Sequence, residues 1–164
     1  MAAPHGTSGF RPFDPASDLP AFDARYDEVG VHASCVALGD AGVLIRGASG
    51  SGKSRLCALL LAEGGRLVAD DRVILDADDR AITAAAPRAL RGLLALRPDR
   101  LLHVPYRKRV RLELVVDLTA TTAGTSAIRS TMLCGRPLAR IRLDPAMPHA
   151  SARVRQTLTE LADG

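Results

Sequence analysis

Short apolar runs separated by glycine and aspartate dominate the chain from about residue 29 to residue 84. Runs of this length, rich in valine, leucine and isoleucine, are typical of β-strands. The strands that they predict span 31–38, 43–46, 66–69, 72–76 and 81–84. A helical pattern follows Ser54 and runs to Glu63, where Gly64-Gly65 supplies the glycine signal that commonly ends a helix.

The second half of the chain has fewer and longer elements. Strands are predicted over 111–118 and 138–143, where apolar residues recur without a helical period. We expect exposed loops over 97–109, which contains prolines and many arginines, and over 119–130, which is small and polar. The chain closes on a predicted amphipathic helix over 150–162. The apolar face of this helix consists of Val154, Leu158 and Leu161.

The balance of elements predicts the fold class. Two helices interrupt a series of strands, and strand and helix do not alternate regularly, so we expect a strand-rich α/β domain with a mixed β-sheet. A length of 164 residues is that of one domain. We expect this domain to span 27–164, because residues 1–26 combine prolines and glycines with little periodicity and are typical of a loose tail.

One glycine-rich turn between a predicted strand and a predicted helix carries a phosphate-binding pattern, G-x-x-x-x-G-K-S. Its glycines let backbone N–H groups point at phosphates, and the helix that follows adds its positive N-terminal end. The residues that we expect to cradle a nucleoside triphosphate, ATP, are Gly47, Ala48, Ser49, Gly50, Ser51, Gly52, Lys53 and Ser54. Within this set, the lysine would reach the β- and γ-phosphates and the last serine would help to hold Mg²⁺.

Composition narrows the classes of partner. The net charge is +4, but aromatic residues make up only 3% of the chain and tryptophan is absent, so a stacking surface for nucleic acid is not expected. The basic cluster within 97–111 is read as a solvated face or as a contact for phosphate or for an acidic protein. The chain shows neither an apolar stretch of about 20 residues nor a signal peptide, which predicts a cytoplasmic protein without a membrane span. Three cysteines at long spacings indicate neither a disulfide framework nor a zinc site.

Phosphoryl transfer to a hydroxyl needs a carboxylate that can take its proton. Asp117 ends an apolar strand in the manner of a metal-binding aspartate, although a simple strand terminator gives the same pattern. The pair Asp70-Asp71 follows the next strand after the phosphate loop. Two adjacent carboxylates suggest a metal or a proton-transfer role, and the alternative is a solvated turn.

The chain resembles the bacterial HPr kinase/phosphorylase family. The resemblance rests on three stretches in the same order: Val31-His32-Ala33-Ser34-Cys35, the phosphate loop with the strand before it, and Gly65-Arg66-Leu67-Val68-Ala69-Asp70-Asp71-Arg72-Val73. It is close over about residues 30–75 and looser as far as Val116-Asp117-Leu118. The resemblance implies a phosphate-loop fold of the phosphoenolpyruvate carboxykinase type.

Members of that family phosphorylate a serine of HPr, a small phosphocarrier of the sugar phosphotransferase system, and many also remove the phosphate. The resemblance implies that Asp70 is the base for the attacking serine and the acid of the reverse reaction. His32 matches the active-site histidine of the family, and a polar strand residue is its alternative. Asp71 would lie next to the metal, and Arg91 falls in the R-G-L segment that helps to form the catalytic surface.

Three departures from the family pattern matter. Long members carry an additional N-terminal domain and assemble as hexamers, whereas this chain looks like the short type of alphaproteobacteria. The metal-binding glutamate of the family is replaced by Ala89. The family's arginine-containing P-G-R-N loop is replaced by Asp144-Pro145-Ala146-Met147-Pro148.

These observations predict an ATP-dependent serine kinase that acts on an HPr-like phosphocarrier, with 97–111 covering or docking that partner, and a possible homo-oligomer of the kind long members form. The second hypothesis is an ATP-binding regulatory sensor with little or no kinase activity, which Ala89 and the missing arginine loop favour. A small-molecule kinase is a third hypothesis, but the chain lacks a recognisable acceptor-pocket motif.

Overall fold

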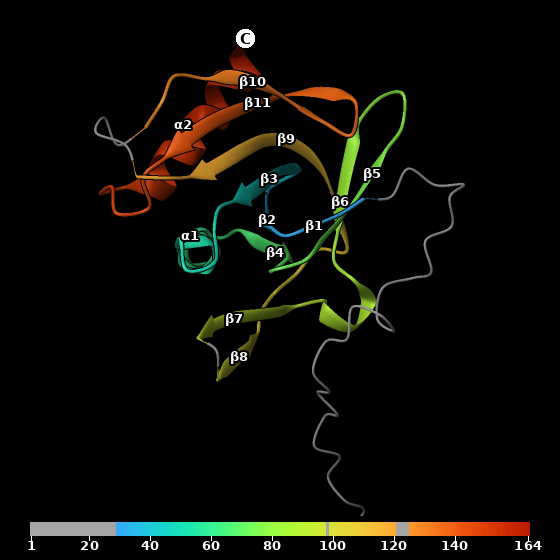
Figure 1. The fold of residues 1–164 in the computed structure, drawn as a ribbon, viewed down its shortest axis with the longest axis vertical. Coiled ribbons are helices and arrows are strands. Elements are labelled where there is room, and N and C mark those ends of the chain that lie inside the picture. Colours follow the sequence, from blue (N-terminus) through green and yellow to red (C-terminus); the bar gives the residue numbers. More distant parts are fainter. Residues whose placement is uncertain (1–28, 98, 121–124) are drawn as a thin grey trace, which may run out of the picture.

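A curved, nine-stranded mixed β-sheet forms the centre of the molecule, and two helices lie against it (Figure 1). The computed structural model describes residues 29–97, 99–120 and 125–164. The predicted tail, 1–26, lies outside these residues. The strands of the sheet are β1 (Val29–Val31), β2 (Ser34–Leu38), β3 (Ala41–Arg46), β4 (Arg66–Ala69), β5 (Val73–Ala77), β6 (Ile82–Ala85), β9 (Arg109–Leu118), β10 (Arg129–Leu133) and β11 (Arg136–Leu143).

The sheet follows the order β1-β5-β6-β9-β3-β2-β4. Strand β11 pairs with β9 on the same edge as β6, further along β9, and β10 pairs with β11. Strand β9 runs parallel to both β3 and β11, whereas all other neighbours in the sheet are antiparallel. This arrangement confirms the predicted mixed sheet.

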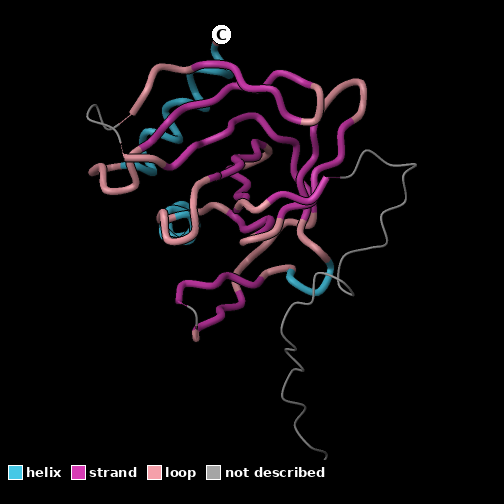
Figure 2. The backbone as a smooth tube through the Cα atoms, viewed as in Figure 1, coloured by secondary structure: helices cyan, strands magenta, loops and turns pink. Residues whose placement is uncertain are grey.

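The two predicted helices are confirmed as α1 (Lys53–Ala62) and α2 (Ala150–Asp163). They contact each other through Glu63, whose carboxylate accepts hydrogen bonds from Ser151 Oγ at 2.7 Å and Arg155 Nε at 2.9 Å. These two hydrogen bonds hold the pKa of Glu63 below its usual range. The closing helix is therefore tied to the end of the helix that follows the phosphate loop (Figure 2).

Two predicted loops are wrong in part. Strand β8 (Arg100–His103) lies within the predicted loop 97–109 and forms an antiparallel hairpin with β7 (Leu93–Arg97), in which Leu94 pairs with Leu102. The flanking arginines concealed these short apolar strands. Strand β10 already begins at Arg129, near the end of the predicted loop 119–130, and β10 and β11 form a hairpin.

The β10–β11 turn consists of Cys134 and Gly135, both with positive φ, of 49° and 73°. Two such residues between paired strands are typical of the tight turn that matches the right-handed twist of a hairpin. The sequence signal for this turn was weak, because cysteine rarely adopts a positive φ.

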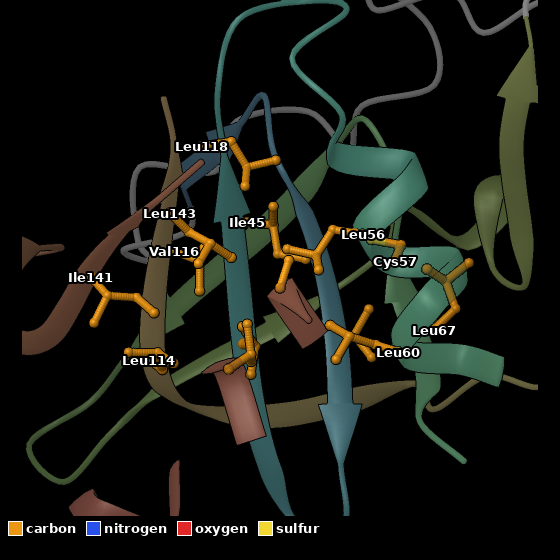
Figure 3. Packing of buried hydrophobic residues seen from close by; sticks show 14 of the residues in the cluster. Ile45, Leu56, Cys57, Leu60, Leu67, Leu114, Val116, Leu118, Ile141 and Leu143 are labelled. Atoms are coloured by element: carbon orange, nitrogen blue, oxygen red, sulfur yellow. The ribbon is translucent and has the colours of Figure 1, made fainter. Parts of the chain in front are cut away.

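Buried side chains form one core on each face of the sheet. The first core joins α1 and α2 to the strands, and Figure 3 shows Leu56, Cys57 and Leu60 of α1 directed towards the sheet. The second core lies on the opposite face, and includes Cys35, Leu44 and Val115. Because both faces are covered there, β3 and the second half of β9 are mostly apolar and do not alternate simply between apolar and polar residues.

Strand β9 contains an irregularity that changes which core one of its faces enters. Val110 and Leu112 pack in the second core, whereas Leu114 and Val116 pack in the first. These residues would share one face in a regular strand, since side chains alternate with a period of two. The register with β3 shifts beside Glu113, which pairs with no residue of β3, β6 or β11, and this extra residue turns the following side chains to the other face.

Replacing Gly42 by alanine should destabilise the protein by about 1–3 kcal/mol, because the contact between β3 and β9 leaves no room for a side chain. A Cβ atom there would lie 2.6 Å from the carbonyl oxygen of Arg111 and 2.7 Å from Val110 Cγ1. The free energy of unfolding in urea measures the effect. Gly30→Ala is the matched control, because its Cβ would meet only the Arg72 side chain at 3.5 Å or more. Equal stabilities of the two variants would contradict the tight packing of β3 on β9.

Candidate functional site

The glycine-rich loop, residues 47–54, connects the end of β3 to the start of α1. Gly52 precedes the helix with φ of 101°, a left-handed conformation that favours glycine, and it lies against Pro145. Gly47 is confined as well, because a side chain at this position would collide with Ser51. The strand–loop–helix context that the sequence predicted is therefore present.

Lys53 folds back onto the loop. Its Nζ donates hydrogen bonds to the carbonyl oxygens of Gly47 at 2.8 Å and Ala48 at 3.0 Å, and the residue is only 8% exposed. The hydroxyl of Ser51 is buried and has no hydrogen-bond partner among the described residues. A buried ammonium and an unpartnered hydroxyl in one loop suit an oxygen-rich anion such as a phosphate chain.

Asp70 is the buried carboxylate of the site. It follows β4, and the pairing of Cys35 with Ala69 brings Ser34 and Asp70 side by side on β2 and β4. Ser34 Oγ donates to Asp70 Oδ1 at 2.7 Å, and the backbone N–H of Ala95 in β7 donates to Oδ2 at 2.9 Å. Ser54 Oγ, at the start of α1, lies 3.3 and 3.4 Å from the two carboxylate oxygens. Four segments of chain thus fix one carboxylate next to the phosphate loop.

Asp71 turns to a different partner from Asp70. Its φ of 68° lies in the left-handed region, which is uncommon for a residue with a side chain and which redirects the chain after β4. Asp71 Oδ1 lies 2.7 Å from His32 Nε2, and both side chains are at least half exposed. The structure therefore separates the predicted aspartate pair into one buried carboxylate and one exposed carboxylate–histidine pair.

These groups line a single open cavity of about 510 Å³. His32, Lys53, Ser54, Asp70 and Asp71 all contribute to its wall, together with residues of the phosphate loop. A smaller cavity of about 150 Å³ adjoins it at the two aspartates and is otherwise mostly apolar. The leucines that line the smaller cavity are Leu90, Leu93 and Leu101.

Three residues of the site were missed by sequence reasoning. Ser34 belonged to a recognised stretch, but only the β2–β4 pairing shows that it bonds Asp70. Ala95 contributes through its backbone, which no side-chain pattern reveals. Arg55 lines the large cavity from the first turn of α1. Its position directly after Ser54 in the sequence could have indicated that it lies near the phosphate loop.

Arg91 is not among the residues that line either cavity at the aspartates. It follows the short 3₁₀ helix Arg88–Leu90, and its Nε is buried without a partner among the described residues. Ala89, which replaces the family's glutamate, is exposed on that 3₁₀ helix. The structure does not bring Arg91 together with the other predicted catalytic residues.

Asp117 is held by two arginines at the carboxyl ends of the central strands. Arg46 binds it with Nε at 2.7 Å and a terminal nitrogen at 3.0 Å, and Arg140 contributes a contact at 3.1 Å. Burial alone would raise the pKa of Asp117, but the hydrogen bonds and charges of Arg46 and Arg140 outweigh it and lower this pKa. This arrangement favours a structural role at the strand end over metal binding.

A cluster of three or more histidine, cysteine, aspartate or glutamate side chains that could hold a metal is absent from the described part of the chain. The oxygens of Ser54 and Asp71, which both line the large cavity, are nonetheless hard ligands of the kind that Mg²⁺ takes, and Mg²⁺ commonly keeps several waters and binds substrate phosphates. The residues present therefore suit a magnesium ion that arrives with a nucleotide.

Comparisons with known proteins point to one family. Residues 25–127 match the family model of the HPr serine kinase C-terminal domain. The HPr kinase/phosphorylase of Bordetella pertussis is 33% identical over 139 residues, which cover 73% of this chain and 45% of that protein. The corresponding protein of Lactobacillus acidophilus is 34% identical over 96 residues, covering 54% of this chain and 30% of that protein. The chain thus spans less than half the length of these curated relatives.

The structural comparison concerns the fold. The HPr(Ser) kinase/phosphatase from Coxiella burnetii matches with a TM-score of 0.67 at 20% identity, covering 80% of this chain and 88% of that one. This confirms the predicted phosphate-loop fold with a strand-rich mixed sheet. In the described residues, neither helix combines the length and the apolar character that a membrane crossing requires.

Asp117→Asn should lower the free energy of unfolding at pH 7 by about 1–3 kcal/mol, because it leaves Arg46 and Arg140 without their carboxylate. The folded-state pKa lies below the unfolded value of about 3.9, so this stabilisation is complete above that value and is lost as the pH falls through the folded pKa. Urea unfolding at pH 7, 4.5 and 3 should therefore show a difference that shrinks with acidification.

Asp76→Asn is the control for this measurement. Asp76 pairs with Arg109 at 3.3 Å, and both side chains are well exposed, so the loss should stay below about 0.5 kcal/mol. A difference between Asp117→Asn and the wild-type chain that did not change with pH would refute the ionic contribution.

Proposed function

The chain belongs to the HPr serine kinase family through its C-terminal domain, and we propose that it is an ATP-dependent protein serine kinase that acts on an HPr-like phosphocarrier. The observation that carries this proposal is the position of Asp70, buried and hydrogen-bonded beside the phosphate loop, yet lining the open cavity. A carboxylate held in this way is suited to take a proton from a hydroxyl that approaches the loop.

ATP would bind with its phosphates along residues 47–54. Lys53 Nζ would exchange its bonds to the carbonyls of Gly47 and Ala48 for phosphate oxygens, and the Ser51 hydroxyl would gain the partner that it lacks. Arg55 adds a second positive charge to the cavity wall. Backbone N–H groups at the start of α1 complete this anion site.

Ser54 and the exposed Asp71 would hold Mg²⁺, as the sequence predicts. When bound, the ion neutralises charge on the phosphates and orients them. The proposal does not need a glutamate at position 89 for this, since Ser54 and Asp71 supply oxygens.

The acceptor serine would approach Asp70 from the open side of the cavity. As the serine oxygen bonds to the γ-phosphorus, the bond between that phosphorus and the bridging oxygen of ADP breaks, and a carboxylate oxygen of Asp70 takes the hydroxyl proton. Ser34 and the Ala95 N–H keep the carboxylate oriented. His32 holds Asp71 in place from the other side. In the reverse, phosphorylase, reaction Asp70 would return the proton.

One observation favours the second candidate function, an ATP-binding sensor with little transfer activity. Ala89 is exposed, and Arg91 does not line the cavity, so the segment that helps to form the catalytic surface in the family contributes no charge there. The two functions differ in a single measurable respect, the gain of one phosphate by the carrier.

Asp70→Asn should abolish phosphate transfer and leave ATP affinity within about threefold, because asparagine keeps the shape of the side chain but cannot accept the proton. Intact mass of an HPr-like carrier after incubation with Mg²⁺ and ATP measures transfer, and calorimetry measures binding. Asp79→Asn, on an exposed turn, is the matched control and should behave as the wild-type chain.

Lys53→Ala should reduce both binding and transfer. If the wild-type chain transfers phosphate and the Asp70→Asn variant still does so, Asp70 is excluded as the base. Binding of ATP without any transfer by the wild-type chain would instead favour the sensor.

Ser34→Ala should lower kcat for phosphate transfer several-fold and leave ATP affinity unchanged. Its hydroxyl donates to Asp70 Oδ1, and without this hydrogen bond the carboxylate is less firmly oriented towards an incoming hydroxyl. Transfer to the carrier measures kcat and calorimetry measures ATP affinity, with the exposed Ser130→Ala as the control. An unchanged kcat would show that Ser34 does not position Asp70.

A further inference from the structure

The sheet divides at β9, and a third cavity lies in that division. We propose that this cavity, which we name the fork cavity, binds a small anion that carries a phosphate group. It has a volume of about 300 Å³, and its charged lining residues are Arg80, Arg111, Glu113 and Arg136. It shares no lining residue with the cavity beside the phosphate loop. The proposal is therefore independent of the proposed kinase function.

The division follows from the register of β9. Residues Arg109 to Arg111 pair with β6, whereas Leu114 to Leu118 pair with β11 along the same edge. Leu112 and Glu113 have no pairing partner on that edge. In Figure 1 the turn of the β10–β11 hairpin lies beside the start of β6, and a hydrogen bond from Arg136 to the carbonyl oxygen of Asp78 joins the two hairpins. The bulge at Glu113 thus opens a notch in an otherwise continuous sheet.

The three arginines reach the notch from three separate elements. Arg80 lies on the turn before β6, Arg111 on β9 and Arg136 at the start of β11. Segments far apart in the sequence therefore converge on one cavity. A solvated face of a single strand or helix would not produce this convergence.

Two of the arginines are held in place by contacts that use few of their donors. Arg111 Nε lies 3.2 Å from Glu113 Oε1, and a terminal nitrogen of Arg136 donates to the carbonyl oxygen of Asp78 at 3.2 Å. A guanidinium carries five N–H donors, so most of the donors remain for a ligand. Side chains fixed before binding lose less conformational entropy when a ligand arrives.

The charge of the cavity favours an anion. Glu113 is the only carboxylate among its lining residues, against three guanidinium groups. The nearby Asp78 carboxylate accepts the backbone N–H groups of Arg80 and Ala81 at 2.7 and 2.9 Å. These two hydrogen bonds are the main cause that lowers the pKa of Asp78, and the charges of Arg136 and Arg80 contribute less. Three guanidinium groups thus face the two carboxylates of Glu113 and Asp78, which leaves a positive excess for an incoming anion.

The lining also selects the kind of anion. Planar guanidinium groups bind phosphate through paired hydrogen bonds, which a single-atom anion such as chloride cannot accept in the same way. The volume is at the lower end of the range for ligand pockets and suits inorganic phosphate or a small phosphate ester. Pro137 and Leu161 form an apolar part of the wall that could contact the carbon skeleton of an ester.

The test is a calorimetric titration with inorganic phosphate and, separately, with glycerol 3-phosphate. The full chain is used in the presence of Mg²⁺ and a saturating non-hydrolysable ATP analogue, so that the phosphate loop is filled. Saturable binding is expected, and Arg136→Gln should weaken it about tenfold, the effect of losing a charge-assisted hydrogen-bond pair. Phosphate and the ester compete for one site if the phosphate group carries recognition.

Arg80→Gln is the second variant, because Arg80 is exposed and its replacement should leave folding unchanged. It should also weaken binding several-fold. Arg142→Gln, an exposed arginine on β11 outside the cavity, is the matched control and should bind as the wild-type chain does. A lack of saturable binding, an equal effect of sodium chloride at the same ionic strength, or equal affinities of all three variants would each overturn the proposal.

Discussion

The parallel contact between β3 and β9 is the constraint on which the rest of the structure depends. It fixes the end of β3, from which the phosphate loop begins, and it places Asp117 beside Arg46 at the same edge of the sheet. The contact is close enough that Gly42 accommodates no side chain against the backbone of β9. The bulge at Glu113 changes the core that one face of β9 enters, so that Leu114 packs in the first core although Leu112 packs in the second.

The free energy of burying Asp70 explains the organisation of the site around it. A carboxylate removed from water is costly unless hydrogen bonds replace its hydration. Ser34 and the Ala95 N–H provide them from β2 and β7, with Ser54 at longer range. The β7–β8 hairpin, which lies outside the main sheet, is therefore linked to the site through one backbone donor. Asp71 avoids the same cost by turning outwards to His32.

Chemistry in this chain concentrates where regular structure ends. The phosphate loop follows a strand, Asp71 has a left-handed backbone, and the fork cavity lies where the ladder of β9 is interrupted. Regular ladders saturate their own backbone groups, whereas these irregular points leave side chains and donors for ligands. The kinase proposal and the anion proposal both use such points, at separate places in the same sheet.

The phosphate loop, both helices, most strands and the mixed sheet could be predicted from the amino-acid sequence, because they follow from local signals such as glycine spacing and apolar runs. The proximity of Lys53, Ser54 and the two aspartates could also be predicted, since these residues follow adjacent elements. The folded structure was needed to show that Asp70 is buried against Ser34 while Asp71 contacts His32, that Asp117 pairs with two arginines, and that Arg91 lies outside the cavity lining. The β7–β8 hairpin and the division of the sheet at Glu113 could not be predicted from local sequence patterns either. Each of these depends on strand register and burial, which arise from contacts between residues far apart in the chain.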